Sequence, residues 1–148
     1  MIVDFHDMLN ALVNAEVRFL VVGAHALAVH GVPRATGDLD VWVRPDAENA
    51  SRVIQALTRF GAPINDLGIR IDDFCKPELV AQLGLPPYRI DFLTSISGVD
   101  FEDAWNERVE AEIESVRVPV LGLKSFVQNK RASGRTKDVA DLESLGER

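Results

Sequence analysis

Asp38 and Asp40 stand one residue apart at the start of a segment rich in valine and tryptophan, DLDVWV. Successive residues of a strand point to opposite faces, so we expect both carboxylates on one face while Leu39 and Val41 face the core. Carboxylates this close repel one another unless a cation lies between them. Mg²⁺ is such a cation, because it binds one or two carboxylates together with phosphate oxygens and water. Mn²⁺ is an alternative ion.

Asp91 supplies a third carboxylate. It alternates with Ile90 and Phe92 in the segment YRIDFL, which predicts a strand with Asp91 on its polar face. Three carboxylates can hold two metal ions, one activating an attacking hydroxyl and the other neutralising a triphosphate leaving group. A solvated strand end would also contain an Asp-x-Asp pair, so the pair indicates a site only together with other features.

The turn at Gly23-Ala24 is such a feature, because it joins the apolar run Arg18–Val22 to a stretch of small helix-forming residues. The free N–H groups at the start of a helix bind phosphate. A triphosphate held there would reach metal ions held at Asp38 and Asp40. The alternative is a simple chain reversal.

Positive charge is concentrated near the C-terminus, although the net charge of the chain is −7. The net charge argues against a broad basic face that would bind nucleic acid through counterion release. The local cluster is either a solvated helix face or a binding surface, and its members are Lys124, Lys130, Arg131, Arg135 and Lys137.

These segments together resemble the DNA-polymerase-beta-like nucleotidyltransferases, whose signature is a hydrophobic residue, Gly, Gly or Ser, a spacer of about a dozen residues and Asp-hydrophobic-Asp/Glu-hydrophobic. Here the match is Val22-Gly23-Ala24, thirteen residues, then DLDV. The spacer ending RATGD is similar to that of a subgroup that includes bacterial abortive-infection toxins of toxin–antitoxin pairs. That subgroup also carries a later Lys/Arg-x-Asp, here RID at 89–91, and a basic C-terminal motif, here NKRASGRTKDVAD at 129–141.

The resemblance implies a role for each matching residue. Asp38, Asp40 and Asp91 would be the catalytic carboxylates and metal ligands, and Asp91 would help to activate the incoming hydroxyl. The residues that would contact the nucleotide, or steady the loop beside it, are Gly23, Ala24, Arg34, Thr36, Lys130, Arg135 and Lys137. Asp138 and Asp141 would either orient these cations or cap the last helix.

The elements that must position these residues follow from the pattern of apolar residues. Helical spacing predicts helices over 3–15, 24–30, 47–60, 101–108, 121–132 and 137–145, and alternation predicts strands over 18–22, 38–43 and 88–93 with two edge-like strands in 109–121. The segment 61–87 has no clear pattern. This order predicts an α/β or α+β fold with a small mixed sheet and helices packed on it. The resemblance implies the nucleotidyltransferase fold, similar to the polymerase-beta palm.

Length and composition predict one domain over residues 1–148, with a helical segment from about 121 to 148. Cys75 is the one cysteine, which excludes a disulfide framework and favours a reducing, cytoplasmic setting. The first residues, MIVDFHDMLN, lack the pattern of a leader, and the longest apolar run is too short to span a membrane.

The predicted function is therefore metal-dependent transfer of a nucleoside monophosphate from a nucleoside triphosphate to a hydroxyl of RNA, protein or a small molecule. Ala24 departs from the family pattern, since alanine has no hydroxyl to bond a phosphate oxygen. Two alternatives stay open. One is a degenerate member that binds nucleotide or a partner protein without turnover. The other is a structural or antitoxin-like partner, recognised through its acidic surface.

Overall fold

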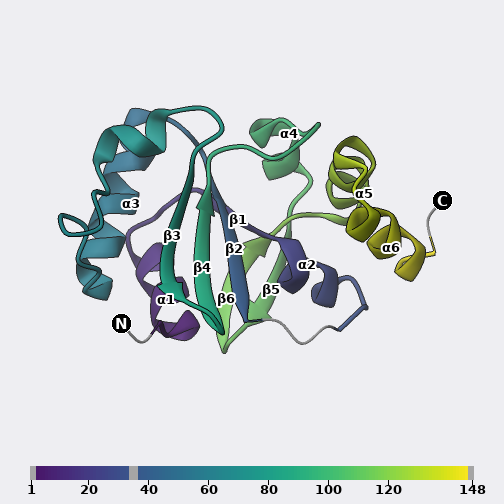
Figure 1. Cartoon of the computed structure of the whole chain (residues 1–148), viewed down its shortest axis with the longest axis horizontal. Helices are drawn as coiled ribbons and strands as arrows, with labels where there is room; N and C mark the ends of the chain where they lie inside the picture. Colours follow the sequence, from purple (N-terminus) through teal and green to yellow (C-terminus); the bar gives the residue numbers. More distant parts are fainter. Residues whose placement is uncertain (1–2, 34–36, 147–148) are drawn as a thin grey trace.

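A six-stranded mixed sheet forms the centre of the molecule in the computed structural model, which describes residues 3–33 and 37–146 (Figure 1). The strands lie in the order β3-β4-β2-β1-β6-β5. In chain order the elements are α1 (Phe5–Asn14), β1 (Phe19–Val22), α2 (Gly23–Val29), β2 (Asp38–Val43), α3 (Ala47–Phe60), the 3-10 helix η1 (Ile71–Cys75), β3 (Val80–Leu85), β4 (Tyr88–Leu93), α4 (Phe101–Asn106), β5 (Val109–Ile113), β6 (Val116–Val120), α5 (Leu123–Ser133) and α6 (Thr136–Ser144). The predicted mixed sheet with helices packed on it is confirmed.

The sheet combines parallel and antiparallel neighbours. β1 is antiparallel to β2 and parallel to β6, and β2 is parallel to β4. The two outer pairs, β3 with β4 and β5 with β6, are antiparallel. The central strands β1 and β2 therefore run in opposite directions, which brings the end of β1 beside the start of β2.

β2 is buried on one face and polar at the start of the other. Leu39, Val41 and Val43 are fully buried, whereas Asp38 and Asp40 are only partly buried. This is the alternation that the sequence predicts.

The helices begin and end at residues suited to those positions. The side chain of Asp4 accepts the backbone N–H of Asp7 at the start of α1, and Asp46 does the same for Asn49 at the start of α3. Gly61 ends α3 in the left-handed conformation. α1 packs against α3, while α5 packs against α6 beyond the other side of the sheet (Figure 1).

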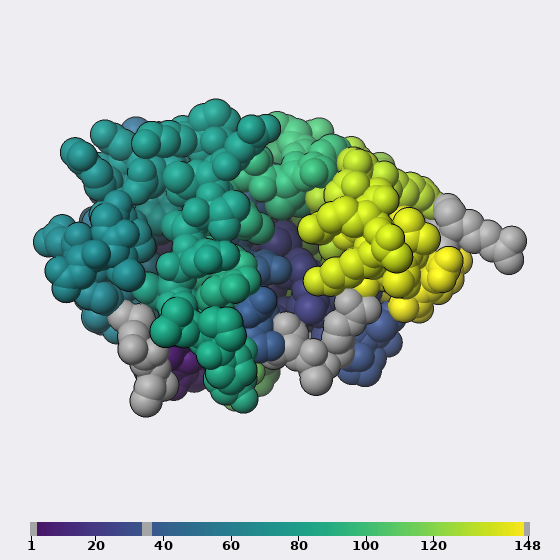
Figure 2. All heavy atoms as spheres, viewed as in Figure 1, coloured from purple at the N-terminus to yellow at the C-terminus, as the bar shows by residue number. Residues whose placement is uncertain are grey.

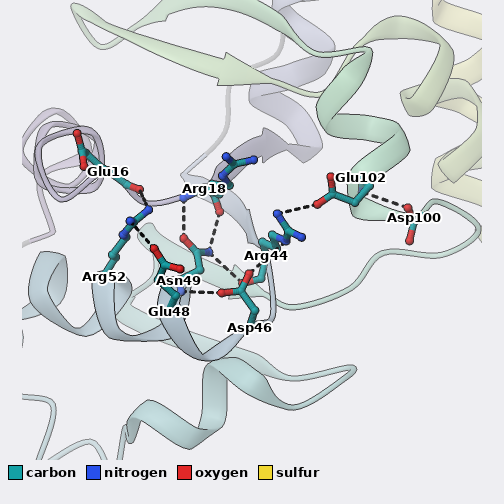
Figure 3. Close-up of polar contacts among 9 residues, drawn as sticks. All are labelled: Glu16, Arg18, Arg44, Asp46, Glu48, Asn49, Arg52, Asp100 and Glu102. Carbon is teal, nitrogen blue, oxygen red and sulfur yellow. Dashed lines mark hydrogen bonds and ion pairs between the residues drawn. The ribbon is translucent and has the colours of Figure 1, made fainter.

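Asn49 connects the first two strands. Its amide nitrogen donates to the carbonyls of Arg18, at 3.0 Å, and Arg44, at 2.9 Å, and its carbonyl accepts the Arg18 N–H at 2.7 Å (Figure 3). These residues flank the start of β1 and the end of β2, so Asn49 supports the pairing of Phe19 with Val43. The same register places Val22 opposite Asp40 at the far end.

The structure fills in one segment that the sequence left unassigned and corrects one prediction about the strands. The segment 61–87, which has no clear pattern, contains η1 and the strand β3, whose exposed apolar residues hide the alternation. The two strands in 109–121 are not both edge strands. β6 lies between β1 and β5 because it pairs with both, and only β5 is at the edge.

Candidate active site

One row of register partners crosses the sheet and carries two of the predicted carboxylates. Val22 of β1 lies opposite Asp40 of β2, Asp40 opposite Asp91 of β4, and Asp91 opposite Gln82 of β3. Directly opposite residues share a face of the sheet. Asp40 and Asp91 therefore lie side by side, on the face that also carries Asp38.

Arg89 lies between the carboxylates because it is the register partner of Asp38 and is two residues from Asp91. Its Nε donates to Asp91 Oδ1 at 2.8 Å, and its Nη2 donates to Asp91 Oδ2 at 3.2 Å and to Asp38 Oδ2 at 3.3 Å. Both oxygens of Asp91 thus accept a hydrogen bond from one guanidinium, which is the bidentate arrangement that arginine favours with carboxylates.

Asp40 has a raised pKa of about 6. Burial of its carboxyl is the main cause, and the nearby charges of Asp91 and Asp38 add to it, while Lys137 and Lys130 oppose the rise. The charged form of the Asp40 carboxyl is therefore disfavoured in the folded protein.

Gly23 lies directly against Asp40. Its φ of +69° is in the left-handed region, and a side chain there would run into the Asp40 carboxylate. Only glycine fits both the backbone conformation and the space. The turn from β1 to α2 therefore brings its backbone against Asp40, as the sequence predicts.

A cleft of about 490 Å³ opens beside this pair. Figure 2 shows it as a hollow between the β3–β4 side of the molecule and the yellow surface of α6, with residues from the first third of the chain at its floor. Its lining is Val22, Gly23, Asp40, Leu93, Ile96, Ser97, Asn129, Lys130, Ala132, Ser133 and Arg135.

Lys130 reaches this cleft from α5 and is held by two acidic residues of α6. Its Nζ lies 3.2 Å from Asp138 Oδ1 and 3.7 Å from Asp141 Oδ2. All three side chains are buried. Burial raises the pKa of Asp138, but hydrogen bonds from Arg135, Ser133 and Lys130 outweigh it and hold the pKa well below its usual range.

Of the other two predicted cations, Arg135 lines the cleft and Lys137 is not part of its lining. Arg135 donates from Nε to Asp138 Oδ2 at 2.8 Å, although its side chain is 69% exposed. Lys137 is exposed at the start of α6, and its charge lowers the pKa of Asp40. Asp138 therefore accepts hydrogen bonds from both Arg135 and Lys130, so the orienting role and the capping role predicted for it coexist.

The remaining predicted residues are placed less centrally. Ala24 is the second residue of α2, beside the cleft-lining Gly23. Arg34 and Thr36 lie outside the described residues. Among the residues that the structure describes, the cleft lining includes Asp40 but neither Asp38 nor Asp91.

Carboxylate oxygens are suitable ligands for a hard divalent cation. The three carboxylates are, however, not arranged around one point as ligands of the same ion. Within residues 3–33 and 37–146, no group of three or more His, Cys, Asp or Glu side chains is arranged to hold a metal ion. Arg89 already neutralises Asp91 and part of Asp38. The raised pKa of Asp40 nevertheless marks a place where a cation would be stabilised. A metal ion at this site is therefore a proposal.

Several residues of the site were not predicted to belong to it. Arg89 shares the face of Asp91 by strand alternation, which was a usable signal. Leu93, the last residue of β4, lines the cleft together with Ile96 and Ser97 of the following loop, and no pattern in the sequence marks them. Asn129 lies within the C-terminal motif and donates to the carbonyl of Ser97 at 3.0 Å, which fixes α5 against that loop.

Comparison with solved structures supports the fold. A crystal structure of a "putative nucleotidyltransferase" from Thermotoga maritima matches with a TM-score of 0.62 and 20% identity, over 95% of this chain and 89% of that chain. A comparison with curated proteins finds no match. Among the described residues, no helix combines the length and apolar character needed to cross a membrane.

The family is identified by the sequence itself. A protein-family model described as "Nucleotidyltransferase of unknown function (DUF6036)" matches residues 3–146. That span contains the Gly23 turn, the three carboxylates and the basic residues of α5 and α6. The chain therefore belongs to this family of nucleotidyltransferases.

Proposed function

We propose that the protein transfers a nucleoside monophosphate from a nucleoside triphosphate to a hydroxyl acceptor and releases pyrophosphate. The observation that carries this proposal is the side-by-side position of Asp40 and Asp91 next to a cleft with Lys130 and Arg135 in its wall. Phosphoryl transfer needs carboxylates that can bind metal ions and cations that can bind phosphate oxygens. Both kinds of group must lie around the same phosphorus atom.

In this reaction the acceptor oxygen attacks the α-phosphorus, and the bond from that phosphorus to the bridging oxygen of the β-phosphate breaks. The acceptor hydroxyl loses its proton, which the Asp91 carboxylate would accept, and pyrophosphate leaves with the electron pair of the broken bond. Asp38, Asp40 and Asp91 would hold Mg²⁺, or Mn²⁺ as an alternative. The ion would supply positive charge for the phosphates and lower the pKa of the attacking hydroxyl.

The residues of the chain itself have distinct roles in the proposal. Asp91, kept in one orientation by Arg89, would orient the acceptor hydroxyl. Lys130, Arg135 and Lys137 would bind the negative charge that gathers on the transferring and leaving phosphates. The backbone at Gly23 and Ala24 would approach the phosphates closely, since Gly23 has no side chain.

The identity of the acceptor and the biological role belong to the proposal as well. RNA, protein and small molecules all offer hydroxyl groups, and the relation to abortive-infection toxins predicts an antitoxin-like partner. In this proposal the acceptor would bind beside the cleft, to a partner protein or to a second copy.

A second candidate is a nucleotide-binding protein without turnover. It is favoured by the hydrogen bonds of Arg89, which occupy both oxygens of Asp91 and one of Asp38. An arginine that neutralises these groups could replace the metal ion structurally. In this case nucleotide binding would not depend on a divalent ion.

The first experiment is calorimetric titration of the protein with each of the four ribonucleoside triphosphates, with and without Mg²⁺. The test variant is Asp38→Asn combined with Asp40→Asn, which keeps the shapes of the side chains. Asp66→Asn, at an exposed position in the loop after α3, is the matched control. Transfer is then followed with α-phosphate-labelled nucleotide against RNA and protein acceptors.

The transferase proposal predicts Mg²⁺-dependent binding of at least one triphosphate, lost in the double variant and kept in Asp66→Asn, together with label on an acceptor. Binding that needs no metal and persists in the double variant supports the second candidate. Absence of binding under every condition would overturn both candidates.

A further inference from the structure

The edge strand β3 is exposed at both ends, and the side chain of Val3 packs against its Gly84. Its sequence, VAQLGL, contains no charged residue, and it lies at the outer edge of the sheet (Figure 1). Val80 is 55% exposed, and Leu85 and Tyr88, at the other end of the β3–β4 hairpin, are 78% and 59% exposed. Proteins usually protect an edge strand with charges, prolines or a covering element, because its free backbone groups pair readily with another strand.

The register with β4 identifies the free backbone groups. Leu85 pairs with Tyr88 across the two-residue turn, and Leu83 and Ala81 pair with Ile90 and Phe92. In a two-residue hairpin these alternate residues exchange hydrogen bonds with the partner strand. The N–H and C=O groups of Val80, Gln82 and Gly84 therefore point outward from the sheet.

The opposite edge of the same sheet is protected. β5, with sequence VEAEI, carries exposed Glu110 and Glu112. Two copies of that edge would bring like charges together. The contrast matters because the chain as a whole carries a net charge of −7, so a charge-free strand is where two copies can approach without repulsion.

We propose that β3 pairs with β3 of a second copy of this chain in an antiparallel arrangement. A two-fold axis at Gln82 places Gln82 opposite Gln82 and Val80 opposite Gly84, which engages every outward-facing residue of β3. Antiparallel pairing also brings the exposed Val80 end of one copy to the exposed Leu85 end of the other. The strand is thus complementary to itself, as a two-fold interface requires.

The pairing has a consequence for the site. Opposite residues share a face of the sheet, and Gln82 is the register partner of Asp91. The two sheets would become one continuous sheet with both copies of Asp40 and Asp91 on the same face. Gln82 of the second copy would then lie on the strand that follows β3, on the face of Asp91, and would extend the surface available to an acceptor.

The first test is the mass of the protein in solution, measured by light scattering coupled to size exclusion. We expect twice the chain mass of 16.3 kDa for the wild type. Gln82→Lys places two positive charges opposite each other and should give a monomer. Gln55→Lys, the same change at an exposed position of α3, should leave the dimer intact. Circular dichroism shows whether each variant is folded.

The second test is cross-linking at the axis. Hydrogen-bonded antiparallel partners have Cα atoms about 5.5 Å apart, within the range of a disulfide. In a Cys75→Ser background, which removes the exposed thiol, Gln82→Cys should form a covalent dimer on oxidation and Gln55→Cys should not.

A monomeric wild type, a dimer that survives Gln82→Lys, or a Gln82→Cys chain that does not cross-link would each overturn the proposal. None of these measurements depends on nucleotide, so their failure is distinct from a failure of the proposed transferase activity. Stable pairing with an unrelated protein in place of a second copy would also contradict it.

Discussion

Arg89 holds Asp91 through two hydrogen bonds, of 2.8 Å from Nε and 3.2 Å from Nη2, and reaches Asp38 with the same Nη2 group at 3.3 Å. One guanidinium therefore compensates two of the three carboxylates on this face of the sheet. Asp40, the register partner of Asp91, has a raised pKa. The site thus has a built-in cation at one end and a place for another beside Asp40.

Arg89→Met should make the protein depend on divalent ions for stability. Without the guanidinium, Asp38, Asp40 and Asp91 repel one another more strongly, and an added cation would relieve this repulsion. We expect a lower melting temperature than wild type in a chelating buffer, and a larger rise on addition of Mg²⁺. Differential scanning calorimetry measures both.

Arg59→Met, an exposed substitution on α3, is the control for loss of an arginine and should change neither value. An Mg²⁺ response of Arg89→Met equal to that of wild type would show that Arg89 does not compensate these carboxylates.

The raised pKa of Asp40 predicts a pH dependence of stability. The unfolded pKa is about 3.9, and the folded value is about 6. Between these values the folded state binds more protons than the unfolded state, so stability falls as the pH rises from about 4 to about 6. Asp40→Asn removes this loss and should raise the free energy of unfolding at pH 7 by roughly 3 kcal/mol in metal-free buffer.

Urea unfolding at several pH values measures the effect, and Asp66→Asn is the exposed control. Below about pH 4 the free energy of unfolding decreases as the pH falls. The reason is that Asp138 has a lowered pKa, so its contribution to stability is lost in this range. A metal-free stability of Asp40→Asn at or below that of wild type at pH 7 would contradict the assigned burial and charge environment of Asp40.

Much of the fold could be predicted because the spacing of apolar residues along the sequence reflects which side chains are buried. β2 alternates between buried apolar residues and Asp38 and Asp40, and α3 has an acidic N-cap and a glycine after its last turn. β3 was missed because an exposed edge strand has no need to alternate. β6 was given the wrong position because pairing with β1, a strand far away in the sequence, leaves no local signal.

The residues of the site also include some that the sequence predicts and some that it does not. Asp38, Asp40 and Asp91 could be assigned to one face from strand alternation and from the resemblance. Alternation also places Arg89 on the face of Asp91, but its position opposite Asp38 depends on the parallel register of β2 and β4. Leu93, Ile96 and Ser97 line the cleft only because α5 packs over the loop after β4, through the hydrogen bond from Asn129 to Ser97.

Lys130→Met should strongly destabilise the protein. The substitution keeps most of the apolar stem but leaves buried Asp138 and Asp141 without the ammonium group that lies 3.2 and 3.7 Å from their oxygens. Removing one partner of a buried ion cluster costs about 3–5 kcal/mol. Lys124→Met, an exposed change one turn and a half earlier on α5, should cost less than about 0.5 kcal/mol. Urea unfolding at neutral pH measures both, and equal small losses would show that the cluster does not need Lys130.

One glycine lies at each end of α2, and replacing each by alanine distinguishes the effect of backbone strain from the effect of a steric clash at the site. Gly23 and Gly31 have positive φ angles of +69° and +102°, but a side chain at Gly23 meets the Asp40 carboxylate whereas one at Gly31 meets nothing within 4 Å. Alanine in the left-handed region costs roughly 1–2 kcal/mol. Gly31→Ala should therefore lose about this much stability and keep its nucleotide binding.

Gly23→Ala should lose more stability than Gly31→Ala and should also displace Asp40, since its methyl group and the carboxylate cannot occupy the same space. We expect nucleotide binding to fall at least tenfold in Gly23→Ala, measured by titration at a temperature where both variants are folded. Equal nucleotide affinity in the two variants would mean that the close approach of Gly23 to Asp40 has no part in binding, and would remove the turn between β1 and α2 from the site.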